Sequence, residues 1–100
     1  MIRADEQGNL YILSDNSGYF RIQGLPNVSG KLDITFYGDM EVKKEFDVNG
    51  QQEVIVKLSR KDIEDIGVGV HQWIADLIHG DEKDTIVYQT ITVIEKEVWW

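Results

Sequence analysis

The sequence contains no cysteine, so it has no disulfide framework, no thiolate nucleophile and no cysteine-based zinc site. In a chain of 100 residues without cross-links, an apolar core must stabilise the fold unaided. No run approaches the roughly 20 consecutive apolar residues that span a bilayer. Residues 1–6 also lack the apolar segment of a secretory signal. We therefore expect no membrane partner and no export by a signal peptide.

Cations and histidines are also scarce. Ten Lys and Arg stand against 18 Asp and Glu, which gives a formal net charge of −8 at pH 7. Because affinity for a phosphate backbone depends chiefly on clustered cations, we expect no nucleic-acid partner. The two histidines, His71 and His79, would have to converge with carboxylates or a nucleophile to form a zinc site or a catalytic triad. Their spacing does not require this, so the sequence favours structural roles for both.

The residues that are present indicate one folded domain over residues 1–100. The chain is 42% hydrophobic and 10% aromatic, with a single proline, which is typical of globular domains and not of disordered segments. A chain of this length accommodates one compact core.

Turn-forming clusters rich in Gly, Asn, Asp and Ser recur at intervals of about 8 to 12 residues, which is typical of an all-β sandwich or barrel. The runs between them alternate apolar and polar residues or are continuously apolar. About seven strands are therefore expected, at residues 10–13, 19–25, 31–37, 41–48, 53–58, 68–78 and 86–94. The dense apolar content of 53–58 and 86–94 predicts strands in the interior of a sheet.

Asn49-Gly50 favours the positive φ angles of a two-residue type I′ turn. The strand that ends at Val48 is therefore predicted to fold back as a hairpin onto residues 52–58. In the strand before this turn, Lys44 falls on the apolar side, which indicates a position near a sheet edge.

A short helical turn is predicted near residues 60–66. Ser59 is a suitable N-cap, Asp62 completes a capping box, and Leu58 with Ile63 has the spacing of a hydrophobic staple. Gly67 then ends the helix. The strand that follows carries Trp73 among alternating apolar residues, so Trp73 is predicted to lie in the core.

Two acidic clusters are candidate sites for a hard cation. Asp62, Glu64 and Asp65 form one cluster, and Asp81, Glu82 and Asp84 form the other. Neither matches an EF-hand loop, and the segment that begins at Asp15 has a proline where that loop needs its bidentate glutamate. The sequence therefore favours turn chemistry over metal binding at these places.

The 18 carboxylates also include no feature that selects a catalytic pair. We expect no enzyme, no cofactor and no catalytic or metal-binding residue. A histidine within hydrogen-bond reach of a carboxylate inside a cleft would instead indicate catalysis.

Three aromatic residues are candidates for a partner interface: Tyr37, Trp99 and Trp100. Two adjacent indoles after the last strand are difficult for the same chain to bury, so they suggest contact with a partner or with further chain. Packing over one end of the fold is the alternative.

The order of the motifs from residue 30 to residue 95 resembles the N-terminal immunoglobulin-like domain of bacteriophage baseplate upper proteins and related tail proteins. The resemblance depends on the predicted hairpin, the stretch Val54-Ile55-Val56-Lys57-Leu58-Ser59-Arg60-Lys61-Asp62-Ile63, the stretch Gly67-Val68-Gly69-Val70-His71-Gln72-Trp73, and the last strand. It implies an immunoglobulin-like β-sandwich without an active site.

The same resemblance implies a structural role in the virion, after synthesis in the host cytoplasm. The partners would be other tail or baseplate subunits, including a second copy of the chain. A carbohydrate-binding or adhesion module that uses exposed Tyr and Trp is the alternative function.

Overall fold

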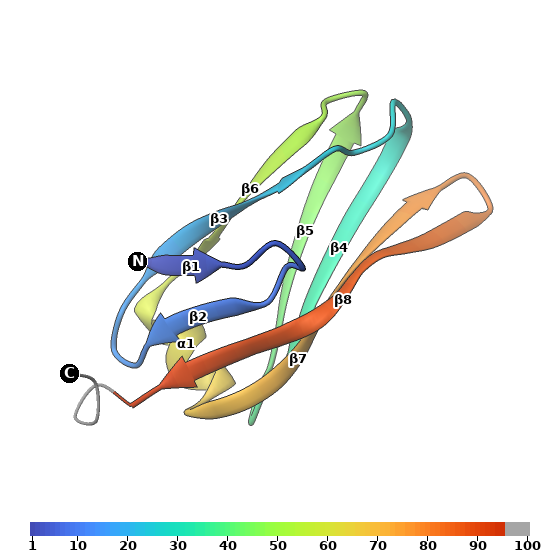
Figure 1. Cartoon of the computed structure of the whole chain (residues 1–100). Coiled ribbons are helices and arrows are strands. Elements are labelled where there is room, and N and C mark those ends of the chain that lie inside the picture. The colour runs from blue at the N-terminus through green and yellow to red at the C-terminus, as the bar shows by residue number, and fades with distance from the viewer. Residues whose placement is uncertain (96–100) are drawn as a thin grey trace.

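A computed structural model describes residues 1–95 of the chain as eight strands and one helix (Figure 1). In chain order these elements are β1 (Ile2–Ala4), β2 (Leu10–Leu13), β3 (Gly18–Gln23), β4 (Ser29–Tyr37), β5 (Glu41–Asn49), β6 (Glu53–Leu58), α1 (Arg60–Ile66), β7 (Gly69–His79) and β8 (Glu82–Ile94). The prediction of an all-β chain with one short helical turn is confirmed. The short strand β1 was not predicted.

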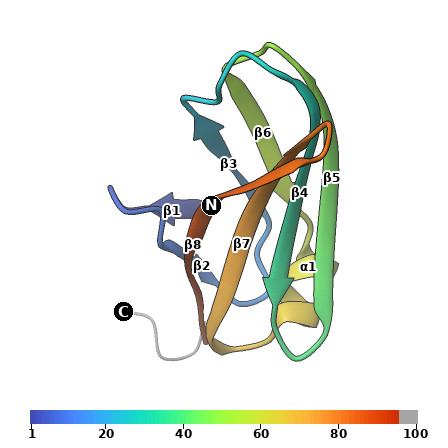
Figure 2. The same ribbon diagram turned by 90° about the vertical axis from the view of Figure 1, so that its right-hand side faces the viewer.

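The strands form one large sheet and one small sheet. The large sheet has the order β1-β2-β8-β7-β4-β5, and β3 pairs with β6 in the small sheet. β2 and β8 run parallel, whereas the other neighbours are antiparallel. Figures 1 and 2 show that the large sheet curls into a half-barrel, with β3 and β6 facing its inner side.

The core lies between the inner face of the large sheet and the β3–β6 pair. Inward residues of β4 and β7 are fully buried, among them Phe36 and Trp73. Phe20 and Ile22 of β3 point into the same core. Trp73 is 2% exposed, so its predicted place in the core is confirmed.

Helix α1 begins as the sequence predicts. The Ser59 side chain accepts a hydrogen bond from the Asp62 backbone N–H, and the Asp62 carboxylate accepts one from the Ser59 N–H at 2.8 Å. Leu58 and Ile63 are both buried, as a hydrophobic staple requires. Gly67 ends the helix with φ of 85°, a conformation that favours glycine.

The predicted Asn49-Gly50 hairpin is wrong. β5 pairs with β4 at the edge of the large sheet, whereas β6 pairs with β3 in the small sheet. Gly50 has the positive φ that the sequence indicates, but its N–H donates to the Val28 carbonyl oxygen at 3.0 Å. The connection therefore carries the chain from one sheet to the other.

The prediction that residues 53–58 form an interior strand is wrong for the same reason. β6 is one half of a two-stranded sheet, and Ile55 on its outer face is 45% exposed. The edge position of Lys44, in contrast, is confirmed, because β5 is the last strand of the large sheet.

Candidate functional site

The free edge of β8 is the main candidate for an interaction site. β7 pairs with one edge of β8 from Glu82 to Val93, but β2 pairs with the other edge only from Ile91 to Ile94. In the described part of the chain, no strand pairs with the outer side of Glu82–Gln89. The β7–β8 hairpin extends past β2 in Figure 1. The prediction that residues 86–94 lie in the interior of a sheet therefore holds only for their second half.

A cleft of about 450 Å³ lies beside this edge. β8 forms one wall, and β3, whose only strand partner in the described residues is β6, forms the other. Buried rings of Phe20 and Trp73 contribute to its lining. The other lining residues come from β1, the β1–β2 turn, β2, β3 and β8: Ala4, Asp5, Glu6, Gln7, Gly8, Leu10, Arg21, Ile22, Gln23, Ile86, Val87, Tyr88 and Gln89.

The β1–β2 turn at one end of the cleft is held by a hydrogen bond from Trp73 and by hydrogen bonds within the turn. Trp73 Nε1 donates to the Gly8 carbonyl oxygen at 3.1 Å. Asp5 accepts hydrogen bonds from the Asn9 side chain at 2.9 Å and from the backbone N–H groups of Asn9 and Gln7. These bonds hold the pKa of Asp5 below its ordinary value despite some desolvation, and the bond from the Asn9 side chain contributes most. The end of the cleft is therefore preorganised.

The outer face of the large sheet carries Tyr37, one of the predicted interface residues. Its side chain is 47% exposed, and in the register it lies between Glu41 of β5 and Gln72 of β7. Tyr37 is accessible to a partner, but it does not line the cleft. Trp99 and Trp100, the other two predicted interface residues, lie outside the described residues.

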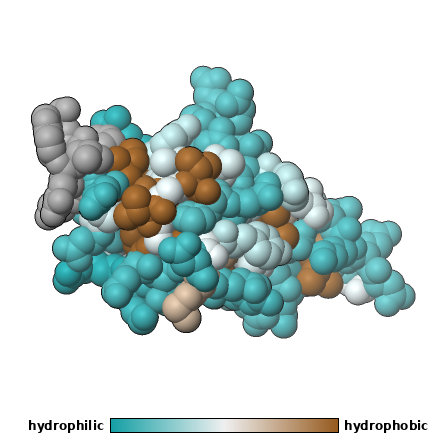
Figure 3. Space-filling view, turned by 90° about the horizontal axis from the view of Figure 1, so that it is seen from below, coloured by the Kyte–Doolittle hydropathy of each residue, from teal (hydrophilic) through white to brown (hydrophobic). Residues whose placement is uncertain are grey.

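Apolar side chains are also exposed at the end of the molecule where β7 begins. Val68 is 53% and Val70 66% exposed. Figure 3, which looks at the molecule from below, shows apolar patches separated by hydrophilic side chains. This face offers small patches and not a continuous apolar surface.

His71 has a local structural contact. Its ring is half-buried, and Nε2 lies 3.0 Å from the carbonyl oxygen of Gly67. This contact links the end of α1 to the start of β7. The structural role that the sequence favours agrees with this geometry.

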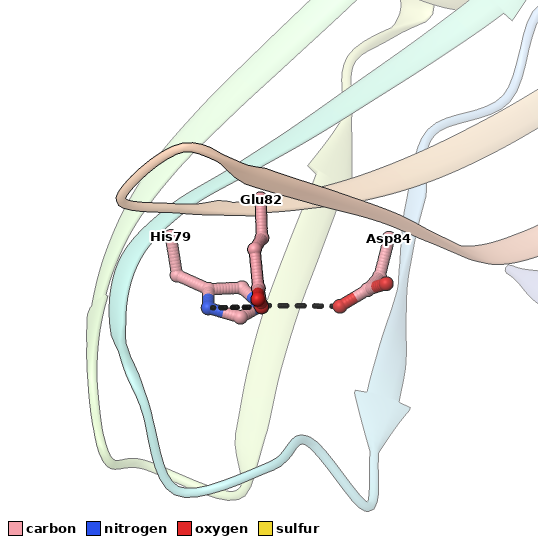
Figure 4. A group of neighbouring side chains, drawn as sticks. All are labelled: His79, Glu82 and Asp84. Carbon is pink, nitrogen blue, oxygen red and sulfur yellow. Dashed lines mark hydrogen bonds and ion pairs between the residues drawn. The ribbon is translucent and has the colours of Figure 1, made fainter.

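His79 lies at the tip of the β7–β8 hairpin with two carboxylates (Figure 4). Nε2 is 3.0 Å from Asp84 Oδ2, and Nδ1 is 3.6 Å from Glu82 Oε2. The sequence grouped Asp81 with these two acids, whereas the structure brings His79 to them. The strand alternation on either side of the turn is the signal that identifies this grouping, because residues 79, 82 and 84 share one face of a hairpin.

Asp62 and Asp65 of the first acidic cluster form ion pairs. The Lys44 ammonium lies 2.8 Å from the Asp62 carboxylate, and Lys61 lies 2.8 Å from Asp65. Partial burial acts to raise the pKa of Asp62, but hydrogen bonds from Lys44 and from the Ser59 backbone outweigh it, so the pKa is lower than usual. Asp62 is therefore part of the capping box of α1, as the sequence predicted.

Comparisons of the chain with family models, with curated proteins and with solved structures found no match. In residues 1–95, the single helix is far too short to cross a membrane.

Proposed function

We propose that this chain is a non-catalytic structural domain that joins other proteins by accepting an extended strand on the free edge of β8. The observation that carries this proposal is the segment Glu82–Gln89, which pairs with β7 on one side and with no strand of residues 1–95 on the other. The segment lies beside a cleft lined by buried aromatic rings. Exposed strand edges present unpaired N–H and C=O groups that template the addition of a strand.

The composition of the edge supports the proposal. Edge strands that are not used for binding are commonly short or charged. β1 is only three residues long, and β5 has a charged outer face. In β8, charges are confined to the tip, and residues 85–90 have no charged side chain and no proline. Tyr88 is 65% exposed in this uncharged stretch. These properties favour association.

We also propose the finer architecture and the biological setting that the sequence resemblance implies. The fold would be an immunoglobulin-like β-sandwich, and the partners would be tail or baseplate subunits of a bacteriophage, a second copy of the chain included. The packing of β3 and β6 against the large sheet supports a two-layer description. The capped helical turn before β7 supports the resemblance.

The test is sedimentation velocity over a range of concentrations, alone and with the purified products of neighbouring genes. We expect the wild-type chain to associate with itself or with one of these products. Ile86→Lys/Tyr88→Lys, which adds charge to the free segment, should abolish the association. Tyr37→Lys, which adds one charge on the outer face away from the cleft, should leave it intact. A strict monomer that binds none of the products would contradict the proposal.

A carbohydrate-binding function is the second candidate. The lining of the cleft combines an exposed residue, Tyr88, with the polar residues Arg21, Gln23 and Gln89. Aromatic rings and planar polar groups are suited to sugar rings and hydroxyls. Trp73 is buried and offers no ring face to a sugar. A glycan array on which Tyr88→Ala abolishes wild-type signal would support this function, and an array without signal would exclude it for the glycans tested.

A further inference from the structure

The tip of the β7–β8 hairpin places three potential metal ligands on one face. His79 and Glu82 are the last cross-strand pair before the turn, and Asp84 follows two positions later on β8. Side chains two positions apart on a strand point to the same face. Figure 4 shows the His79 ring beside the Glu82 and Asp84 carboxylates. One nitrogen of the ring and one oxygen of each carboxylate lie within 4.8 Å of one another.

The two carboxylates flank different nitrogens of the His79 ring. Asp84 faces Nε2 at 3.0 Å, and Glu82 faces Nδ1 at 3.6 Å. A neutral imidazole has only one N–H, so one of the two carboxylates would face a nitrogen lone pair. The nitrogen that carries the lone pair can bind a metal ion, as neutral imidazole commonly does. The neighbouring cation, Lys83, pairs instead with Asp76, at 3.6 Å.

We propose that this cluster binds one Zn²⁺ ion through one ring nitrogen of His79 and one oxygen each of Glu82 and Asp84. Imidazole nitrogen and carboxylate oxygen bind zinc at about 2.0 to 2.2 Å, and two such donors on a tetrahedral ion lie roughly 3.3 Å apart. The observed 3.0 Å between Nε2 and Asp84 Oδ2 is close to that spacing. Glu82 is 75% exposed, so its side chain has the freedom to complete the set.

The donor set favours zinc over a hard cation. Ca²⁺ takes about six to eight oxygen ligands, which two monodentate carboxylates do not provide. An imidazole donor is suited to Zn²⁺ and to other late first-row metals. Three protein ligands leave a fourth position for water. Bound zinc would cross-link β7 to β8 at the tip of the hairpin that carries the proposed free edge.

Isothermal titration calorimetry with zinc chloride and the untagged full-length chain, at pH 7.5, tests the proposal. We expect saturable binding of one Zn²⁺ per chain. His79→Gln and the double variant Glu82→Gln/Asp84→Asn should each weaken it at least tenfold. Asp81→Asn removes one negative charge from the same turn without removing a proposed ligand, and it should change the affinity less than twofold. Circular dichroism establishes that each variant is folded.

A second measurement uses the wild-type chain alone. Zinc should shift the ring resonances of His79 in long-range ¹H–¹⁵N spectra and leave those of His71 unchanged. The proposal is overturned by the absence of saturable heat, by unchanged affinity in His79→Gln, or by zinc shifts at His71 instead of His79. It is also overturned if Asp81→Asn weakens binding as much as the double variant, since that would indicate diffuse attraction to acidic groups.

Discussion

At the scale of single residues, Trp73 connects more parts of the molecule than its burial alone indicates. Its ring stacks on Phe36 of β4 with centroids 5.7 Å apart, and it meets Phe20 of β3 edge-to-face at 5.2 Å. Its N–H holds the β1–β2 turn through Gly8. One side chain therefore joins the two sheets and positions the end of the cleft.

Truncation of Trp73 should be severely destabilising. Trp73→Ala removes the central ring and leaves a cavity, at a cost of about 3 to 5 kcal/mol in the free energy of unfolding. Trp73→Phe loses the hydrogen bond to Gly8 but keeps an aromatic ring, so its cost in the free energy of unfolding should be smaller. Urea unfolding followed by circular dichroism measures both. A loss below about 1 kcal/mol for Trp73→Ala would contradict the assigned role of Trp73.

Asp62 makes the stability of the fold depend on pH in the acid range. Its pKa is lowered in the folded state, so the stability that it contributes is fully present above its unfolded pKa, about 3.9. That contribution is lost as the pH falls through the lower, folded value. Lys44→Met should therefore raise the pKa of Asp62, as measured from its carboxyl carbon shift by NMR. Lys43→Met removes a cation that pairs with Glu41, and an equal shift in that variant would refute the specific role of Lys44.

At the scale of elements, helix α1 is specified locally but is held in place by a distant turn. Its capping box involves only residues 59 and 62. Its last carbonyl groups, however, accept hydrogen bonds from the β4–β5 turn: Asp39 N–H donates to Ile66 at 2.9 Å, and Met40 N–H donates to Asp65 at 2.8 Å. The turn therefore satisfies backbone groups that a helix end leaves without partners.

Gly38 permits this close approach. A Cβ atom added at Gly38 would lie against the Ile66 carbonyl oxygen and 2.5 Å from the Ile66 Cα. Gly38→Ala should therefore cost about 1 to 3 kcal/mol in the free energy of unfolding, because backbone atoms must move. At Gly24 an added Cβ would meet no atom within 4 Å, but φ is +73°. Gly24→Ala therefore measures the cost of backbone strain without a steric clash. Equal unfolding midpoints in urea for Gly38→Ala and the wild type would show that the turn does not restrain α1.

The crossing between β5 and β6 shows why a turn signal does not decide strand pairing. Asn49-Gly50 favours a turn, and Gly50 does adopt a positive φ. The partner of β6, however, is β3, with Phe20 opposite Val56 and Ile22 opposite Val54. These four side chains are buried in the common core. A hairpin with β5 would instead keep β6 in the large sheet, and its side chains would not cover the inner face of that sheet. Burial across the molecule therefore prevails over a local preference.

At the scale of the whole molecule, the order of strands predicts where the fold opens first. β4 and β7 have a paired strand on each side, whereas β1 and β5 lie at the ends of the large sheet. Amide hydrogen exchange followed by NMR should be slowest in β4 and β7. It should be faster at residues 82–89 of β8 than at residues 91–94. Equal protection along β8 in a dilute monomer would argue against a free edge.

The sequence by itself determined the β class, most strand positions, the capped helix and the burial of Trp73. These features depend on the alternation of neighbouring residues or on contacts within a few positions, which the sequence displays directly. The grouping of His79, Glu82 and Asp84 could be predicted from the same strand alternation, because all three lie on one hairpin.

Only the tertiary structure decided the partner of β6, the place of α1 against the β4–β5 turn, and the free half of β8. β2 is four residues long and meets β8 only at Ile91–Ile94, so the rest of β8 remains an edge despite its dense apolar sequence. Such pairings join segments far apart in the chain, and the burial of one shared core selects them.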